Sequence, residues 1–182
     1  MDIVLRLARE RGVGSVVKSK SMASEEIHLN AALEAAGITV VETDLGEWII
    51  QLAKEPPSHI IAPAIHKTTR QIAELFSAAV GEPLPPEPEV LTAAARRTLR
   101  QKFLQADMGI SGANFAVAET GTIVIVTNEG NGRLVTTLPR IHVAIMGMEK
   151  VIPTLTDLTV FLQILAGDGT AMEPQMNADK RK

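Results

Sequence analysis

A short loop, KSKS, carries charged and hydroxyl side chains between a predicted strand and a predicted helix: Lys18, Ser19, Lys20 and Ser21. Ammonium groups, free backbone N–H groups and the positive end of a helix dipole together attract an anion such as a phosphate or a carboxylate. The alternative is a solvated loop whose lysines pair with Glu25 and Glu26, and exposed pairs of this kind contribute little. The loop therefore predicts an anion-binding site, with the solvated loop as the competing interpretation.

A carboxylate occurs at a predicted strand-to-strand turn with the sequence ETGT, from Glu119 to Thr122. A Glu beside buried apolar strands has a raised pKa if it is unpaired, and it can then act as a base or nucleophile. Glu119 is therefore a candidate catalytic residue, and Thr120 and Gly121 are candidate ligand-binding residues. The alternative is a Glu that caps the turn or pairs with Arg133 or Lys150.

A Gly-rich loop that ends in a guanidinium group follows the next predicted strand. Its candidate ligand-binding residues are Asn128, Asn131 and Arg133. Arginine suits two-point capture of a carboxylate or phosphate, whereas the alternative is a surface turn with an ordinary salt bridge. The sequence GNG is not GxGxxG, so the loop does not predict a dinucleotide site.

The sequence contains four histidines, and none is spaced from another as in HxxxH or HxH, so it predicts no metal site. His66 follows the third predicted strand, where α/β proteins place ligands, and it is the best histidine candidate for a catalytic role. Asp107, Ser111 and Asn114 could complete such a site. No Ser-His-Asp nucleophile elbow is visible.

The elements that must position these residues alternate between helix and strand. Helices are predicted over 2–11, 25–36 (with Ser24 as its N-cap), 45–54, 67–80 and 92–105, and strands over 13–17, 38–41 and 59–62. This alternation predicts a three-layer α/β fold with a mainly parallel sheet.

The pattern changes after residue 107. It becomes strand, polar turn, strand, Gly-rich loop and strand, and the apolar run 123–126 is typical of a strand buried on both faces. A last helix is predicted from about 154 to 166, where Gly167 stops it. We expect loop residues from these strands to converge at one end of the sheet, with Lys18, Lys20 and Arg133 around an anion that Glu119 faces.

Composition favours one globular domain over residues 1–166, followed by a polar tail over 167–182. The 182 residues are 46% hydrophobic and 21% charged. There is no apolar run of ~18 residues and no signal-peptide core, so we expect a cytoplasmic protein without a membrane span. A net charge of −3 and 3% aromatic residues argue against a nucleic-acid partner. The chain contains no cysteine, which excludes disulfides and cysteine-ligated iron–sulfur clusters within it.

Several long blocks also carry a family resemblance: KSKSMASEEIHLN, VETDLGEWIIQL, ISGANFAVAETGT, NEGNGR and TTLPRIHVAIMGMEKV. In their order they resemble the LUD domain of the lactate-utilisation iron–sulfur proteins, most closely the protein B family, over roughly residues 10 to 160. The resemblance implies a core like that of the ribose-phosphate isomerase, glucosamine-phosphate deaminase and CoA-transferase superfamily. Relatives carry cysteine motifs in a further, ferredoxin-like part, so we expect this chain to be truncated, a fragment or a short member.

The resemblance implies a component of an L-lactate to pyruvate oxidation system that binds a small anionic ligand. Its partners would be iron–sulfur and other lactate-utilisation subunits, and the chain itself would bind no cofactor. One alternative is a stand-alone isomerase or CoA-transferase-like enzyme that uses Glu119, because CoA-transferases use a Glu nucleophile. Another is a non-catalytic assembly module. Formation of a homo-oligomer is left open.

Overall fold

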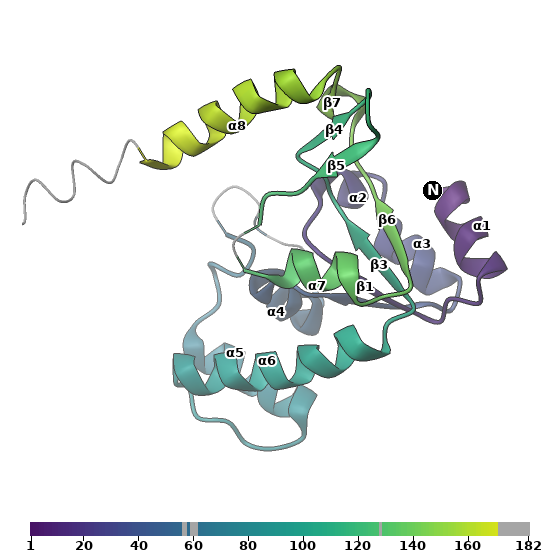
Figure 1. The fold of residues 1–182 in the computed structure, drawn as a ribbon. Coiled ribbons are helices and arrows are strands. Elements are labelled where there is room, and N and C mark those ends of the chain that lie inside the picture. Colours follow the sequence, from purple (N-terminus) through teal and green to yellow (C-terminus); the bar gives the residue numbers. More distant parts are fainter. Residues whose placement is uncertain (56–57, 59–61, 128, 171–182) are drawn as a thin grey trace, which may run out of the picture. The chain divides into compact units, whose positions relative to one another are not determined.

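The computed structural model describes residues 1–55, 58, 62–127 and 129–170. The chain divides into two compact units whose segments alternate along the sequence (Figure 1). Unit 1 consists of Met1–Gly112 and Thr127–Ile145, and unit 2 consists of Ala113–Val126 and the chain from Met146 onward. Whether the two units form the single domain expected over 1–166 stays a prediction.

The sheet of unit 1 has four parallel strands in the order β2-β1-β3-β6. They are β1 (Ser15–Lys18), β2 (Thr39–Glu42), β3 (Met108–Ser111) and β6 (Ile141–Ala144). The register places Lys18 beside both Glu42 and Ile110. The carboxyl ends of three adjacent strands therefore meet at one edge, and the predicted parallel α/β sheet is confirmed.

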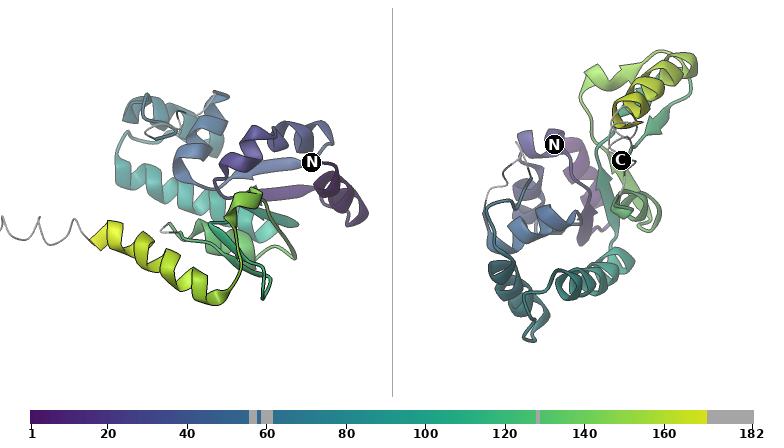
Figure 2. Two further views of the ribbon diagram at one scale, coloured as in Figure 1. Left: turned by 90° about the horizontal axis from the view of Figure 1, so that it is seen from above. Right: turned by 90° about the vertical axis from the view of Figure 1, so that its left-hand side faces the viewer.

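Helices cover both faces of this sheet (Figures 1 and 2). They are α1 (Asp2–Glu10), α2 (Met22–Glu26), α3 (Leu29–Ala35), α4 (Leu45–Ala53), α5 (Thr69–Val80), α6 (Pro88–Gln105) and α7 (Asn131–Thr137). Side chains alternate between the faces of a strand, so Val16 packs with α1 and α3, and Val17 packs with α4, α5, α6 and α7. Unit 1 thus has one apolar core on each side of its sheet.

Unit 2 is built on a three-stranded sheet in the order β5-β4-β7. Its elements are β4 (Phe115–Val117), β5 (Thr122–Val124), the short 3-10 helix η1 (Met148–Lys150), β7 (Val151–Ile152) and α8 (Leu155–Thr170). β4 pairs antiparallel with β5 and parallel with β7. Its core is small: Val117, Ile152 and Leu158 are buried, with Phe115 and Val124 packed against them.

The structure corrects the prediction for the two segments on either side of the Gly-rich loop. The run 123–126 is not a strand buried on both faces: the strand is Thr122–Val124, and Ile123 is 40% exposed. The reason is that β5 lies at the edge of its sheet and is paired only with β4. The loop is followed by the helix α7 instead of leading directly to a strand.

Several helix ends also differ from the prediction. Ser24 is not the N-cap of its helix, because the hydroxyl of Ser21 accepts the hydrogen bond from the Ser24 N–H at 3.4 Å. The predicted helix over 25–36 is two helices, since His28 has a left-handed backbone conformation with φ of 51°. The last helix continues past Gly167 to Thr170. The predicted strand 59–62 lies outside the described residues except for Ala62, which is not in a strand.

Candidate ligand-binding site

Buried polar side chains gather at the carboxyl edge of the parallel sheet in unit 1. Within the described residues, each of them lies at the end of β1, β2 or β3, in the segments that follow β1 and β2, or at the start of α7: Lys18, Ser19, Ser21, Ser24, Glu42, Thr43, Glu47, Ser111 and Asn131. Open α/β sheets bind ligands outside the carboxyl ends of their strands. This edge is therefore the candidate site of unit 1.

Lys18 and Glu42 form a buried ion pair at the centre of this edge. Lys18 is fully buried, and its Nζ donates to Glu42 Oε1 at 2.6 Å. The side-chain amide of Asn30 in α3 donates to the same oxygen at 2.7 Å. Because burying a charge is costly unless it is paired, this carboxylate fixes the lysine at the last position of β1.

Two acceptors beside this pair remain without donors. Glu42 Oε2 and Asn30 Oδ1 are both buried, and neither accepts a hydrogen bond from any residue that the structure describes. Buried acceptors without a partner are rare in folded proteins and mark places where a ligand donor or an ordered water binds. The polar edge thus offers two hydrogen-bond acceptors in addition to the ion pair.

The second lysine of the KSKS loop is also matched by carboxylates. The backbone N–H of Lys20 donates to Asp44 at 2.6 Å, and its Nζ lies 3.5 Å from Glu47 Oε1. The acids that these two lysines contact lie at the end of β2 or in the segment after it. The solvated-loop alternative, in which the lysines pair with Glu25 and Glu26, stays a prediction. An anion-binding role for Lys18, Ser19, Lys20 and Ser21 also stays a prediction.

Ser111 and His142 form a hydrogen-bonded pair that sequence reasoning missed. Ser111 at the end of β3 is fully buried, and its Oγ lies 2.8 Å from His142 Nε2 on β6. Burial lowers the pKa of His142 and favours the neutral ring. The pairing depends on the register of β3 against β6, and the two residues are 31 positions apart in the sequence.

His66 and Asp107, which the sequence places in one candidate site with Ser111, lie in different parts of unit 1. His66 lies in an exposed segment before α5, where its Nε2 is 2.8 Å from Glu55. Hydrogen bonds from Lys67 and then His66 lower the pKa of Glu55. Asp107 binds the backbone N–H groups of Gly14 and Ser15 at the amino edge of the sheet, so it does not join Ser111 at the carboxyl edge.

The ETGT turn belongs to unit 2 and connects β4 to β5, as the sequence predicts. Glu119 is exposed, and its carboxylate accepts a hydrogen bond from the Leu155 N–H, at the start of α8, at 3.2 Å. Thr120 and Thr122 share a hydrogen bond of 2.7 Å, and Gly121 has a positive φ of 68° that the turn requires. This geometry favours a capping role for Glu119, while its convergence with the lysines stays a prediction.

The Gly-rich segment contributes one side chain to the buried edge of unit 1. Asn131 is 8% exposed, and its amide donates to Thr43 Oγ1 at 3.4 Å. Thr43 in turn donates to the carbonyl oxygen of Lys18 at 2.9 Å. Arg133 lies on an exposed position of α7, and Asn128 lies outside the described residues.

A groove of about 640 Å³ between α6 and α7 includes Thr43 and Asn131 of the polar edge in its lining. Its walls are mostly apolar, and it carries two arginines and one glutamate: Thr43, Leu45, Thr92, Ala95, Arg96, Leu99, Arg100, Phe103, Leu104, Glu129, Asn131, Leu134 and Leu138. Small-molecule sites have this character, with predominantly apolar walls and few polar groups. The groove therefore extends the polar edge into an apolar cleft within unit 1.

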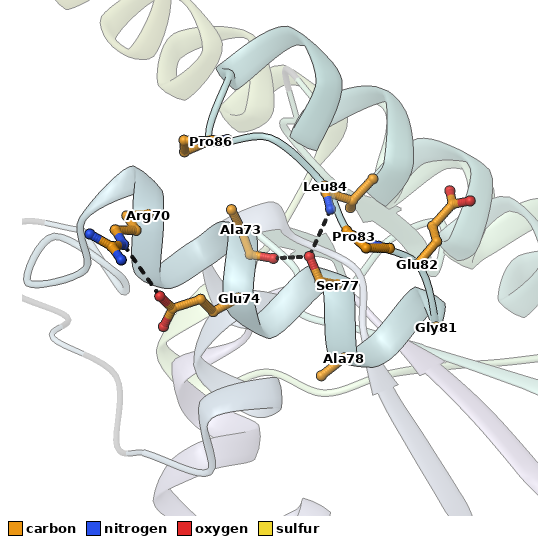
Figure 3. A pocket seen from close by; sticks show the side chains of 10 residues that line it. All are labelled: Arg70, Ala73, Glu74, Ser77, Ala78, Gly81, Glu82, Pro83, Leu84 and Pro86. Atoms are coloured by element: carbon orange, nitrogen blue, oxygen red, sulfur yellow. Dashed lines mark hydrogen bonds and ion pairs between the residues drawn. The ribbon is translucent and has the colours of Figure 1, made fainter.

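A second hollow of about 910 Å³ lies between α5 and the Pro-rich connector that follows it (Figure 3). Its polar side chains satisfy one another: Arg70 pairs with Glu74 at 3.5 Å, and the Ser77 hydroxyl accepts a hydrogen bond from the Leu84 N–H at 2.9 Å. The Arg70–Glu74 pair lies along α5 and only Ser77 bonds to the connector, so these groups already have partners within the protein.

The described residues show neither a cluster of metal ligands nor a membrane-spanning helix. Between residues 1 and 170, apart from the gaps at 56–57, 59–61 and 128, no three His, Asp or Glu side chains cluster as metal ligands. In the same part of the chain, no helix is long and apolar enough to cross a membrane.

The four-stranded parallel sheet with helices on both faces defines an α/β protein, and its carboxyl edge, with buried charges and an adjoining groove, is the candidate site. The chain belongs to the LUD-domain family, whose model matches residues 1–178. The family resemblance expected from the sequence is thereby confirmed. No solved structure matches the chain, so the expected likeness to the isomerase, deaminase and CoA-transferase superfamily stays a prediction.

Curated relatives are about half identical to this chain. It is 51% identical to lactate utilization protein B of Bacillus pumilus, over 89% of this chain and 34% of that protein. The identity to lactate utilization protein B of Shouchella clausii is 54%, over 82% of this chain and 32% of that protein. An Escherichia coli relative named uncharacterized electron transport protein YkgF is 50% identical over 90% of this chain and 34% of its own length. The chain spans about a third of these relatives.

Proposed function

We propose that this chain is the LUD-domain component of an L-lactate utilisation system, in which lactate is oxidised to pyruvate. The observation that carries the proposal is the identity of about 50% to proteins named lactate utilization protein B over most of this chain. The chain contains no cysteine. Cysteine-ligated iron–sulfur centres therefore belong to other subunits or to other parts of a longer protein.

In this proposal the chain binds a small anionic ligand and the electron carriers lie elsewhere. The buried edge around Lys18 and Glu42 supports a binding role because it combines a fixed charge pair with two unsatisfied acceptors. A hydroxyl-bearing acid suits such an edge, since its hydroxyl can donate to Glu42 Oε2 or Asn30 Oδ1.

The purified chain alone is expected not to oxidise lactate. The measurement is the reduction of an artificial electron acceptor by the chain with L-lactate, with and without the iron–sulfur partners that the proposal requires. Lactate-dependent reduction should require both the chain and the partners, because the chain has no cysteine for a cluster and no dinucleotide fingerprint. Reduction by the chain alone, or equal reduction by the partners without it, contradicts the proposal.

An assembly role is a second candidate, and the surface of α8 favours it. Val160, Phe161 and Ile164 are 54%, 41% and 60% exposed on this helix. Exposed apolar patches mark surfaces that bind other proteins. Three variants test this role: Glu119→Gln, Asn131→Ala and Lys20→Ala. If a variant no longer binds ligand but still binds its protein partners, assembly is a function separate from ligand binding.

A further inference from the structure

The groove between α6 and α7 has the shape of a site for an elongated ligand. Its α6 wall is formed by Thr92, Ala95, Arg96, Leu99, Arg100, Phe103 and Leu104. These positions recur every three or four residues, so they share one face of the helix over about 18 Å. Leu134 on α7 and Leu138, the residue that caps the C-terminal end of α7, form the other wall and are 40% and 45% exposed.

Positive charge is concentrated on one side of this groove. Arg96 and Arg100 lie one turn apart on α6, both are exposed, and neither has an ion-pair partner among the described residues. Arg97, which does not line the groove, lies 3.8 Å from Glu82. Glu129 is the only carboxylate of the lining, so the groove has one positive charge in excess.

The inner end of the groove is polar and already ordered. The Asn131 amide group donates to Thr43, which leaves its carbonyl oxygen without a donor in the part of the chain that the structure describes. The side chain is 8% exposed. A ligand hydroxyl or N–H group that reaches this end would therefore find a positioned acceptor.

We propose that this groove binds an amphipathic organic anion larger than lactate, with its acidic head at Arg96 and Arg100 and its apolar body between Leu99, Phe103, Leu134 and Leu138. Pockets for drug-sized ligands measure roughly 300–1,000 Å³, and a groove of about 640 Å³ lies within that range. Lactate alone would leave most of the apolar wall uncovered. The anionic character of the ligand is argued from Arg96 and Arg100 and agrees with the proposed function, but it does not depend on it.

The test is a titration of the full chain with straight-chain monocarboxylates, from L-lactate and butanoate to hexanoate and octanoate, followed by NMR. Shifts should concentrate on resonances of Leu134, Leu138 and Phe103. The affinity should rise about two- to fourfold for each added methylene group, because each enters the apolar wall. Octanol, which lacks the charge, should bind about tenfold more weakly than octanoate.

Matched arginine variants assign the head group. Arg96→Ala and Arg100→Ala should each weaken octanoate binding about tenfold, whereas Arg97→Ala should leave it unchanged. The proposal would be overturned if all three variants bound octanoate with equal affinity, or if the NMR shifts were confined to α8. It would also be overturned if an acidic helical peptide bound in the groove while octanoate had no effect. If the reconstituted system did not oxidise lactate while the chain still bound octanoate, the proposed function would be wrong and the assignment of the groove would stand.

Discussion

Lys18 occupies a position where removal of one charge leaves another without compensation. Its ammonium group and the Glu42 carboxylate are buried and 2.6 Å apart, and Asn30 supplies the other hydrogen bond that this carboxylate accepts. The ion pair by itself is weak evidence for stability, since burying both charges costs almost as much as their attraction returns. The consequence of breaking it is much larger than the net contribution of the intact pair.

Lys18→Met is expected to lower the free energy of unfolding by about 3–5 kcal/mol, because it leaves Glu42 buried without a counter-charge. The double variant Lys18→Met/Glu42→Leu should recover most of this loss, since both charges are then absent. Urea unfolding of the two variants and the wild type gives the comparison. Equal stability of the single and double variants would show that the pair is solvated and not buried as the structure has it.

His142 makes stability depend on pH. Burial lowers its pKa below the usual value of about 6.5, so the unfolded chain takes up a proton before the folded chain does. The contribution of His142 to the free energy of unfolding is fully present above pH 6.5, and it is lost as the pH falls from 6.5 through the lowered pKa of the folded chain. His142→Gln, which keeps a partner for Ser111, should flatten the change in urea midpoint between pH 7.5 and 5.5. His142 and His28 are both exposed by surface area, and His142 is nevertheless desolvated enough to shift its pKa. His28→Asn is therefore the control, and an equal flattening by both variants would contradict the assignment.

At the scale of elements, α7 packs directly on the backbone of β3. A methyl group on Gly109 would lie 1.9 Å from the carbonyl oxygen of Val135, a distance that forces a backbone to move. Glycine at this strand position therefore allows the helix to approach the sheet, and the fully buried Val135 places α7 in the core that Val17 shares.

Gly109→Ala should lower the free energy of unfolding by more than about 3 kcal/mol, because overpacking here strains the backbone of two elements. Gly14→Ala is the matched control, as its added methyl group would lie 3.7 Å from Asp107 in ordinary contact. Thermal unfolding of both variants measures the difference. A Gly109→Ala protein as stable as the control would show that α7 does not contact β3 as described.

The elements of unit 1 were predictable where periodicity decides them. The apolar runs of β1 and β2 and the stripe of α6 indicate a parallel α/β sheet without further information. The strand β3 was not predicted, because its four residues MGIS form no distinct apolar run. α7 was not predictable from its residues, because NGRLVTT contains Gly and β-branched residues that disfavour a helix. Packing of Val135 on Gly109 overrides this preference, and such a contact depends on tertiary structure alone.

The candidate site was predictable in part. The KSKS and NGR motifs supply Lys18 and Asn131 to the buried edge, as turn chemistry at strand ends suggests. Their partners Glu42 and Thr43 could not be predicted, because the strand register that brings them together joins residues 24 and 25 positions apart. The groove required the packing of α6 beside α7, which no local pattern encodes.

At the scale of the whole molecule, apolar surface is concentrated on α8. Val160 and Ile164 are 54% and 60% exposed, while Leu158 on the same helix is in the core of unit 2. Val160→Lys/Ile164→Lys should change the free energy of unfolding by less than about 0.5 kcal/mol and reduce self-association, measured by sedimentation velocity. Leu158→Lys, as the comparison, should destabilise the fold strongly. A comparable loss of folding stability in the double variant would show that Val160 and Ile164 are buried.

The alternation of the two units along the chain also determines when each can be completed during synthesis on the ribosome. Unit 1 lacks its fourth strand until Ala144 has emerged, although its first 112 residues have been made long before. By then the β4–β5 hairpin of unit 2 has already emerged, but β7 and α8 have not. Domains that are contiguous in sequence fold one after another from the N-terminus. Here the three-stranded sheet of β1, β2 and β3 has to wait with an open edge while part of unit 2 is translated, so pauses in translation between residues 112 and 145 would prolong the exposure of that edge.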